Sequence, residues 1–257
     1  MLQRALTDIR DGLLGLAFPQ QCRVCGKAVQ SWDDGVVCAG CWKDPGITRL
    51  FGQLVCPKCG APAARSVEDA QRLHRPSTGQ SCGVCTALPF KSARACGLYS
   101  GALEASLLFL KVSPHICARL RRIIYRTMAA HQQTLAAEVV VPVPLHPIRE
   151  KERGFNQAAI ISRLISHRFD MRLDEGSLLR SRPTERHRAG MDAVDRARSV
   201  ERAFTVARPG LFSGLSILLI DDVYTTGSTL CAATRTLLND GAGDVSVLTV
   251  AKVAGRH

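Results

Sequence analysis

The sequence predicts an α/β protein, a parallel sheet flanked by helices that follows a smaller, cysteine-rich N-terminal module. Two runs of consecutive aliphatic residues predict the sheet, because each run leads into a polar cluster, and the cluster after the C-terminal run leads into residues with helical spacing. Four Cys-x-x-Cys pairs among the 11 cysteines predict the module. We expect an amphipathic segment at 1–19, the module at 20–90 and the α/β domain at 95–257.

One buried strand is predicted by four consecutive aliphatic residues, 217–220, directly before Asp221 and Asp222. Such a run is typical of a strand that is covered on both faces. The two acids then lie at the carboxyl end of that strand, which is the edge at which open α/β sheets bind ligands. Receiver domains and Asp-based phosphatases also place acids at this position, so the pair alone does not define the ligand.

A turn of small hydroxyl residues follows the acids and leads into a segment with helical spacing that stops at Gly241. The backbone N–H groups and hydroxyls of such a turn, together with the positive end of the helix, attract an anion. The turn consists of Thr225, Thr226, Gly227, Ser228 and Thr229. The pattern predicts a ligand that carries both hydroxyl groups and a phosphate, and the alternative is an ordinary buried strand followed by a turn.

The segment 217–230 resembles the phosphoribosyl-pyrophosphate (PRPP) motif of type I phosphoribosyltransferases over the strand, both acids and the whole turn. The resemblance implies a type I phosphoribosyltransferase-like fold. It also implies that Asp221 and Asp222, as the catalytic acids, hold the ribose 2′- and 3′-hydroxyls while residues 225–229 cradle the 5′-phosphate. Mg²⁺ is the implied cofactor, because it would bridge diphosphate and ribose oxygens and keep several of its waters.

A second aliphatic strand begins at Val139 and runs into a cluster of cations, Arg149, Lys151 and Arg153. Such a cluster suits a diphosphate, because arginine gives forked hydrogen bonds and lysine a point charge. The alternative is a solvated basic turn. The whole segment 139–157 resembles the signature of the ComF family of competence-associated proteins, which implies that Arg149 and Arg153 belong to a pyrophosphate-binding loop.

The ComF resemblance covers nearly the whole chain and implies a protein that binds PRPP or a related phosphoribosyl molecule and is linked to competence and DNA uptake. Two alternatives stay open: a non-catalytic competence factor that binds single-stranded DNA, and a regulator that senses PRPP. Phosphoribosyl transfer is the implied activity if the protein is an enzyme. The partners expected from these interpretations are a phosphoribosyl small molecule, single-stranded DNA and proteins of DNA uptake.

The stretch 180–204 is rich in arginine and poor in apolar residues, which predicts a long loop. Phosphoribosyltransferases carry a flexible loop at this place in the chain, which closes over the diphosphate and excludes water. The resemblance therefore makes Arg196 and Arg198 candidates for this clamp. It also aligns Lys111 with the lysine of a Lys-Tyr pair in ComF relatives, whereas Val112 here replaces the aromatic residue.

The spacing of the paired cysteines predicts zinc, because two Cys-x-x-Cys turns complete a tetrahedral site of four thiolates. Such closed sites are structural. We expect sequential pairing, as in a double zinc ribbon, and a cross-braced pairing is the alternative. The ligand pairs are Cys22/Cys25, Cys38/Cys41, Cys56/Cys59 and Cys82/Cys85. Redox-active cysteines are the competing interpretation, but that chemistry predicts a single pair beside a βαβ pattern.

The other three cysteines, Cys96, Cys117 and Cys231, are expected to be buried as small apolar residues. Thiolates held by metal favour a reducing, cytoplasmic setting. No apolar run reaches the roughly 18–20 residues of a membrane-spanning helix. Peripheral contact of the amphipathic segment with the inner membrane is a weaker alternative to packing on the protein.

The formal net charge of +12 favours a polyanion or a phosphorylated ligand. Four arginines between Arg119 and Arg126 fit a solvated helix face, with a nucleic-acid patch as the alternative. Aromatic residues make up only 5% of the chain, which argues against a base-stacking platform.

Overall fold

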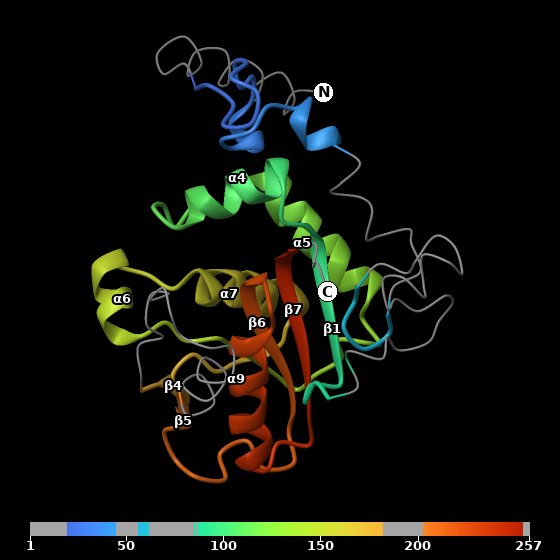
Figure 1. The fold of residues 1–257 in the computed structure, drawn as a ribbon, viewed down its shortest axis with the longest axis vertical. Helices are drawn as coiled ribbons and strands as arrows, with labels where there is room; N and C mark the ends of the chain where they lie inside the picture. Colours follow the sequence, from blue (N-terminus) through green and yellow to red (C-terminus); the bar gives the residue numbers. More distant parts are fainter. Residues whose placement is uncertain (1–19, 45–55, 62–84, 86, 182–202, 254–257) are drawn as a thin grey trace, which may run out of the picture.

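A parallel sheet is the centre of the fold in the computed structural model, which describes residues 20–44, 56–61, 85, 87–181 and 203–253 (Figure 1). Its five strands follow the order β1-β7-β6-β2-β3, and every neighbouring pair is parallel. The strands are β1 (Ser92–Leu98), β2 (Val139–Pro142), β3 (Arg172–Leu173), β6 (Ser216–Tyr224) and β7 (Asp244–Lys252). This architecture confirms the predicted α/β class.

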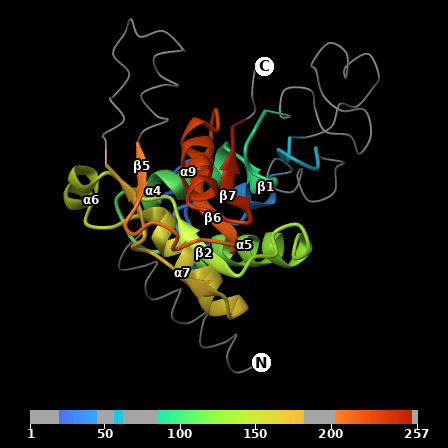
Figure 2. The ribbon, with the colours of Figure 1, turned by 90° about the horizontal axis from the view of Figure 1, so that it is seen from below.

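Helices cover both faces of the sheet, with α9 on one side and α5 and α7 on the other (Figure 2). A short antiparallel pair, β4 (Leu178–Arg180) with β5 (Phe204–Val206), lies beside the sheet. The helices are α4 (Gly101–Leu110), α5 (Ala118–Ala130), α6 (Pro147–Arg153), α7 (Gln157–Phe169) and α9 (Ser228–Asn239).

The aliphatic run of β6 divides its side chains between two hydrophobic cores. Leu218 and Ile220 pack with residues of α4, α5 and α7, whereas Ile217 and Leu219 pack with residues of α9. All four side chains are fully buried. A strand between two helical layers therefore needs apolar residues at every position, which explains why no alternation is visible in its sequence.

The basic segment after β2 differs from the expected loop, because residues 147–153 form the helix α6. Pro147 occupies its first turn, where a missing N–H costs nothing, and Nδ1 of His146 accepts a hydrogen bond from the Ile148 backbone at 3.3 Å. Gly154, with φ +81°, ends the helix in the left-handed conformation. These local capping signals outweigh the high density of charge, so the arginines lie on a helix.

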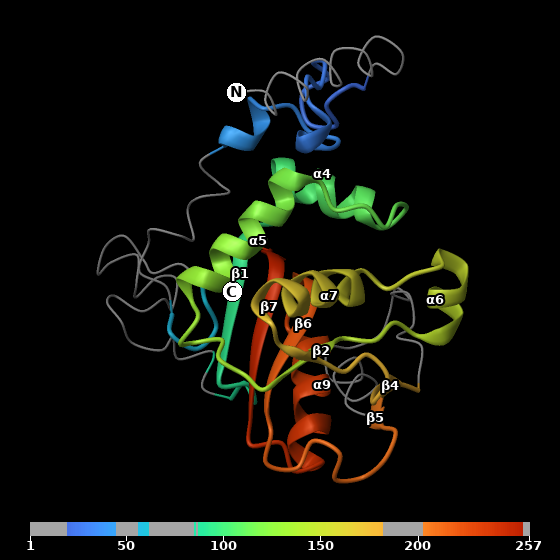
Figure 3. The same cartoon turned by 180° about the vertical axis from the view of Figure 1, so that it is seen from behind.

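The cysteine-rich segments contact the α/β domain at two separate places, beyond α4 for residues 20–44 and beside β1 for residues 56–61 (Figures 1 and 3). In the first, Asp34 accepts a hydrogen bond from Nε of Arg119 at 2.9 Å. In the second, the Ala93 N–H of edge strand β1 donates to the Lys58 carbonyl at 2.6 Å. The second segment thus satisfies backbone groups at the edge of the sheet, which would otherwise be open to pairing with another chain.

Within the ranges that the structure describes, no helix combines the length and the apolar character needed to cross a membrane. Segment 1–19, which is predicted to be amphipathic, lies outside those ranges.

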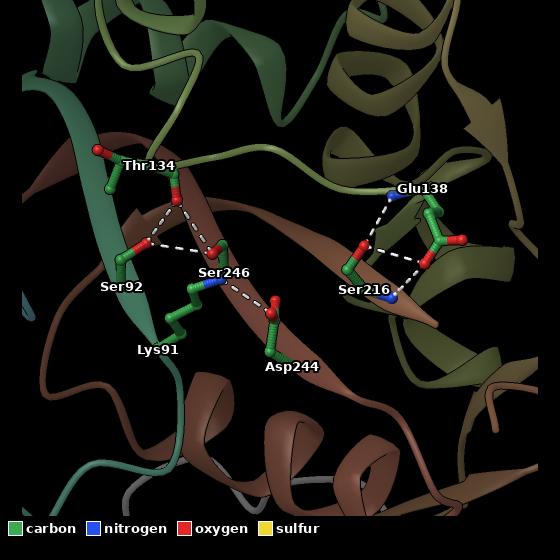
Figure 4. Close-up of polar contacts among 7 residues, drawn as sticks. All are labelled: Lys91, Ser92, Thr134, Glu138, Ser216, Asp244 and Ser246. Carbon is green, nitrogen blue, oxygen red and sulfur yellow. Dashed lines mark hydrogen bonds and ion pairs between the residues drawn. The ribbon is translucent and has the colours of Figure 1, made fainter. Parts of the chain in front are cut away.

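The amino-terminal edge of the sheet is held by the side-chain contacts that Figure 4 shows: an ion pair of Lys91 with Asp244 at 2.8 Å and two clusters of hydrogen bonds. In one cluster, the hydroxyls of Ser92 and Ser246 lie 3.1 Å apart, and both are within hydrogen-bond distance of the Thr134 carbonyl, at 3.0 and 3.2 Å. In the other, one carboxylate oxygen of Glu138 accepts hydrogen bonds from the Ser216 N–H at 2.8 Å and from its hydroxyl at 3.1 Å. The second cluster joins the start of β6 to the residue that precedes β2.

Substitution of Glu138 by glutamine is expected to make stability less dependent on pH. Hydrogen bonds from the Ser216 backbone and hydroxyl lower the pKa of Glu138 below its ordinary value of 4.5. Its carboxylate therefore stabilises the fold above pH 4.5, and this contribution is lost as pH falls through the lowered value. Thermal unfolding should show a lower midpoint for the variant at neutral pH and equal midpoints in acid, with Glu152→Gln as the control at an exposed helix position. A difference that persists unchanged in acid would contradict this assignment.

Candidate functional site

The carboxyl ends of β2 and β6 meet at one edge of the sheet, since Pro142 pairs with Ile220 in parallel register. Asp221 and Asp222 lie within β6, near its carboxyl end, because the strand continues beyond the predicted aliphatic run to Tyr224, and both acids are half-buried. The Asp222 N–H donates to a carboxylate oxygen of Asp221 at 2.8 Å. This bond fixes one carboxylate beside the backbone of the next residue, so the two acids are held close together.

Without a ligand, ionisation of the acidic pair is unfavourable. Burial raises the pKa of Asp221 well above its usual range, and the adjacent charge of Asp222 raises it further. A bound cation or a set of hydroxyl donors would favour the ionised form. The site therefore suits a ligand that brings such groups to the strand end.

A turn of exposed hydroxyls connects β6 to α9. Gly227, with φ +81°, is the residue immediately before the helix, and its carbonyl accepts the Cys231 N–H at 2.8 Å. The hydroxyls of Thr226 and Ser228 lie 2.9 Å apart. The hydroxyl groups and the first backbone N–H groups of a 12-residue helix are thus arranged around one turn, which is a favourable place for an anion.

The acids and the turn open into a cavity of about 390 Å³. Six of the residues expected from the sequence to bind the ligand line it: Arg149, Arg153, Asp221, Asp222, Thr225 and Thr229. Thr226, Gly227 and Ser228 belong to the same turn without lining the cavity. The loop candidates Arg196 and Arg198 lie outside the described residues.

Among the other lining residues, Tyr99, Lys111 and Arg180 were not assigned to the site from the sequence. Lys111 is the C-terminal cap of α4, and Arg180 ends β4, where its guanidinium lies over the Phe204 ring at 5.2 Å. Burial lowers the pKa of Arg180, whereas the charge of Asp221 raises it. The position of Arg180 at the start of the arginine-rich stretch was the only signal in the sequence that could have identified it.

Four cations and two carboxylates line the cavity. The cations are Lys111, Arg149, Arg153 and Arg180. Like charges gathered in a concave site raise the local concentration of an anion. The cavity as a whole therefore favours a ligand with more than one negative charge.

The Asn156-Gln157 pair explains how one of these cations is held. Oε1 of Gln157 accepts a hydrogen bond from Arg153 at 2.7 Å, and its Nε2 donates to the Leu110 carbonyl at 3.2 Å. Asn156 caps α7 by accepting the Ala158 N–H at 3.0 Å. Gln157 thus joins the arginine of α6 to the end of α4, next to Lys111.

The cysteines form two clusters with the grouping expected from sequential pairing. Sulfur atoms within each cluster lie within 4.8 Å of one another, and the Cys25 and Cys38 sulfurs are 3.7 Å apart. A tetrahedral zinc site with bonds of about 2.3 Å needs sulfur separations of about 3.8 Å, so the geometry fits zinc. The clusters are Cys22, Cys25, Cys38 and Cys41, and Cys56, Cys59 and Cys85. Cys82, the expected fourth ligand of the second cluster, lies outside the described residues.

The three cysteines outside these clusters, Cys96, Cys117 and Cys231, are buried as predicted. Desolvation raises the pKa of Cys96 to about 12, so this thiol is protonated at neutral pH.

Residues 13–86 match the family model of the double zinc ribbon domain. Across nearly the whole chain, the protein resembles DNA utilization protein YhgH of Salmonella typhimurium, with 29% identity over 243 residues that cover 90% of this chain and 96% of the relative. Competence protein F of Haemophilus influenzae is 32% identical over 136 residues, 52% of this chain and 59% of the relative. Competence protein ComFC of Bacillus subtilis is 38% identical over 116 residues, 44% of this chain and 43% of the relative.

Solved structures of phosphoribosyl enzymes show weaker likeness. The purine phosphoribosyltransferase from Pyrococcus horikoshii gives a TM-score of 0.32 at 13% identity, over 52% of this chain and 83% of that one. Glutamine PRPP amidotransferase from Bacillus subtilis gives 0.34 at 20% identity, and the match spans only 26% of that longer chain. The chain thus combines a double zinc ribbon match in its N-terminal part with similarity to DNA utilization and competence proteins, and its described α/β domain follows the zinc ribbon.

Proposed function

We propose that the cavity at the sheet edge binds PRPP or a related phosphoribosyl molecule together with Mg²⁺. The observation that carries this proposal is the convergence on one cavity of an acidic pair, a hydroxyl turn at a helix N-terminus and a group of cations. Each of the three groups matches one part of the ligand.

The acidic pair suits the ribose. Ionised carboxylates accept hydrogen bonds only, and the 2′- and 3′-hydroxyls of ribose supply donors at adjacent carbons. Asp221 and Asp222 are adjacent in the chain and half-buried, so they could receive both hydroxyls while water is partly excluded. Carboxylate oxygens are also ligands that Mg²⁺ accepts, and a bound Mg²⁺ would neutralise part of the diphosphate charge.

The two ends of the ligand carry its negative charge. The turn at 225–229 would receive the 5′-phosphate through its backbone N–H groups and exposed hydroxyls. Across the same cavity, Arg149, Arg153 and Arg180 would receive the diphosphate, where arginine can bind two oxygens at once. Arg196 and Arg198 stay a prediction from resemblance for a loop that covers the diphosphate.

Two uses of this site are compatible with its geometry: phosphoribosyl transfer, and sensing of PRPP without turnover. Only phosphoribosyl transfer releases pyrophosphate. Release of pyrophosphate in the presence of purine or pyrimidine bases or ammonia would indicate transfer, whereas PRPP binding without such release would indicate a PRPP-responsive protein. We also retain as predictions a cytoplasmic location and packing of segment 1–19 on the protein, with peripheral contact of this segment with the inner membrane as the weaker alternative.

Calorimetric titration of the zinc-loaded protein with PRPP and Mg²⁺ tests the proposal. Micromolar binding is expected, and Asp221→Asn/Asp222→Asn should weaken it roughly 10- to 100-fold or more, since a hydrogen bond to a charged group contributes about 1.5–3 kcal/mol. Asp170→Asn makes the same chemical change at an exposed helix end with φ 51°, a conformation that asparagine tolerates. This control should bind like the unmutated chain. No binding by the unmutated protein, or full binding by the double variant, would contradict the proposal.

The same site predicts a trade-off between stability and binding. Because burial and Asp222 raise the pKa of Asp221, its ionisation opposes folding, and this cost grows as pH rises from 3.8 through the raised value. Neutral asparagine removes the cost, so Asp221→Asn should raise the thermal midpoint of the ligand-free protein at neutral pH. A gain of about 1 kcal/mol corresponds to roughly 2–4 °C in a chain of this size. A lower midpoint would mean that the carboxylate is structural rather than kept for a ligand.

A second candidate function, binding of single-stranded DNA, is favoured by a cluster on α5 and α7. Tyr125 and Phe169 form an edge-to-face pair with ring centroids 6.0 Å apart, and Arg168 lies over both rings at 5.7 and 5.6 Å. Exposed Arg121 and Arg122 lie three or four residues before Tyr125 on the same helix. Aromatic rings among cations are the combination that binds single strands, although the aromatic content of the sequence argued against it.

The salt dependence of binding tests this second function. A fluorescently labelled oligothymidylate should bind more weakly as salt rises, because each phosphate that the protein neutralises releases counterions. Arg121→Ser/Arg122→Ser should reduce the slope of log affinity against log salt by about 0.7 for each phosphate that is no longer neutralised. Arg163→Ser is the matched control, since Arg163 is paired with Glu175 at 2.7 Å. If the affinity does not change from low to physiological salt, this surface does not bind the DNA through its cations.

A further inference from the structure

We propose that the second cysteine cluster, Cys56, Cys59 and Cys85, positions the 225–229 turn through Lys252 and Tyr224, so that metal in this cluster sets the affinity for the phosphate of the ligand. The proposal rests on the proposed function of the turn as the 5′-phosphate site. It makes Lys252 and Tyr224 positioning residues, since neither lines the cavity.

The first step joins the cysteine cluster to the sheet. Lys252, the last residue of β7, donates a hydrogen bond from Nζ to the Cys59 carbonyl at 2.8 Å. Lys252 is only 7% exposed, and a buried ammonium group is stable only where polar partners surround it. The carbonyl it uses belongs to a cysteine of the cluster, so the position of the ammonium group depends on the conformation of that turn.

The second step joins Lys252 to the strand that carries the site. Its ammonium nitrogen lies 3.7 Å from the centroid of the Tyr224 ring, a close cation–π contact between two buried side chains. Lys252 is also the register partner of Tyr224 in the pairing of β6 with β7. On another side, Phe90 meets the same ring edge to face at 6.2 Å. The ring is therefore held between an aromatic neighbour and a cation.

The third step joins the ring to the turn. A Cβ atom on Gly227 would lie 2.8 Å from Cε2 and 3.1 Å from the hydroxyl of Tyr224, so the ring packs directly against the glycine. Gly227 also has φ +81°, which side chains rarely adopt. Tyr224 immediately precedes the turn in sequence and supports its central residue in space. A shift of the ring would have to move the turn.

Metal would act at the start of this chain of contacts. The segment 56–61 is a tight turn, closed by a hydrogen bond from the Gly60 N–H to the Cys56 carbonyl at 2.9 Å, and thiolate–metal bonds would hold it to Cys85. Arg94 and Ala93 of β1 contact the Pro57 and Lys58 carbonyls at 2.9 and 2.6 Å, which holds the backbone of this turn beside the sheet. Loss of metal removes the constraint on the sulfurs, because binding and folding of such knuckles are coupled.

The first cysteine cluster makes different contacts, which gives an internal comparison. Its segment, 20–44, reaches the α/β domain through the ion pair of Asp34 with Arg119 and packs against α4 and α5. Within the described residues, the side-chain ion pair of this segment goes to α5 and not to Lys252 or Tyr224, although its apolar residues share one hydrophobic core with Val250 and Ala251 of β7. Metal in the first cluster should therefore stabilise the module without affecting the phosphate turn.

Three variants of the full chain and one control test the linkage. Cys56→Ser should lower the zinc content from about two ions to about one per chain, and Lys252→Met should leave it unchanged. Both should accelerate amide hydrogen exchange in residues 225–229 and weaken PRPP binding roughly tenfold, the effect expected from removing a desolvated cation–π contact. Lys252→Arg keeps a cation and a hydrogen-bond donor, so its amide exchange in residues 225–229 and its PRPP affinity should match those of the unmutated protein. Cys25→Ser also removes one zinc ion but should leave the exchange of residues 225–229 and the PRPP affinity unchanged.

The outcomes separate this proposal from the proposed function. If the unmutated protein binds no PRPP, the proposed function fails, yet the exchange rates of residues 225–229 still decide the linkage. If PRPP binds and neither Cys56→Ser nor Lys252→Met changes those exchange rates, the linkage is wrong. Equal acceleration in Cys25→Ser would also overturn it, because zinc would then act through general stability. Since Lys252→Met keeps all cysteines, the test stands even if Cys56→Ser does not fold.

Discussion

Parallel alignment of β2, β6 and β7 is the constraint on which the site depends. Parallel strands end at the same edge of a sheet, so whatever follows β2 and β6 must meet there. The acids near the carboxyl end of β6 and the arginines after β2 are far apart in the sequence, yet they line one cavity. An antiparallel arrangement of the same segments would place them at opposite edges.

Burial of β6 on both faces gives this edge its chemical character. The two hydrophobic cores meet at its aliphatic residues, and the strand then carries two carboxylates into a partly buried position. Burial at this position disfavours the ionised form of Asp221. A residue with only a structural role would not need such an unfavourable carboxylate, so the acid is a candidate for binding a ligand. The sheet thus supplies the rigidity, and the unfavourable charge at its end is available to a ligand.

Local signals explain which parts could be predicted from the sequence. The aliphatic strand, the acidic pair and the turn before α9 form one uninterrupted segment, and the Cys-x-x-Cys spacing predicts zinc ligands, so these features needed no knowledge of the tertiary fold. The choice between sequential and cross-braced grouping of the cysteine pairs did need it. Contacts between distant segments could not be predicted. Arg180 reaches the cavity from β4, and Tyr125 meets Phe169 across two helices. The proximity of Lys252 to Cys59, far apart in the chain, has no sequence signature at all. The helix α6 was missed for another reason, because a short run dense in charge is equally typical of a solvated turn, and only its proline and glycine caps distinguish the two.

The central claim is that one phosphoribosyl ligand occupies the cavity in a single orientation. A crystal structure of the zinc-loaded protein with PRPP and Mg²⁺ tests it most directly. The account predicts the 5′-phosphate at residues 225–229, the ribose hydroxyls on Asp221 and Asp222, and the diphosphate towards Arg149 and Arg153. Density for the ligand on another surface, such as the face of α5 and α7, with the cavity holding only solvent, would contradict it.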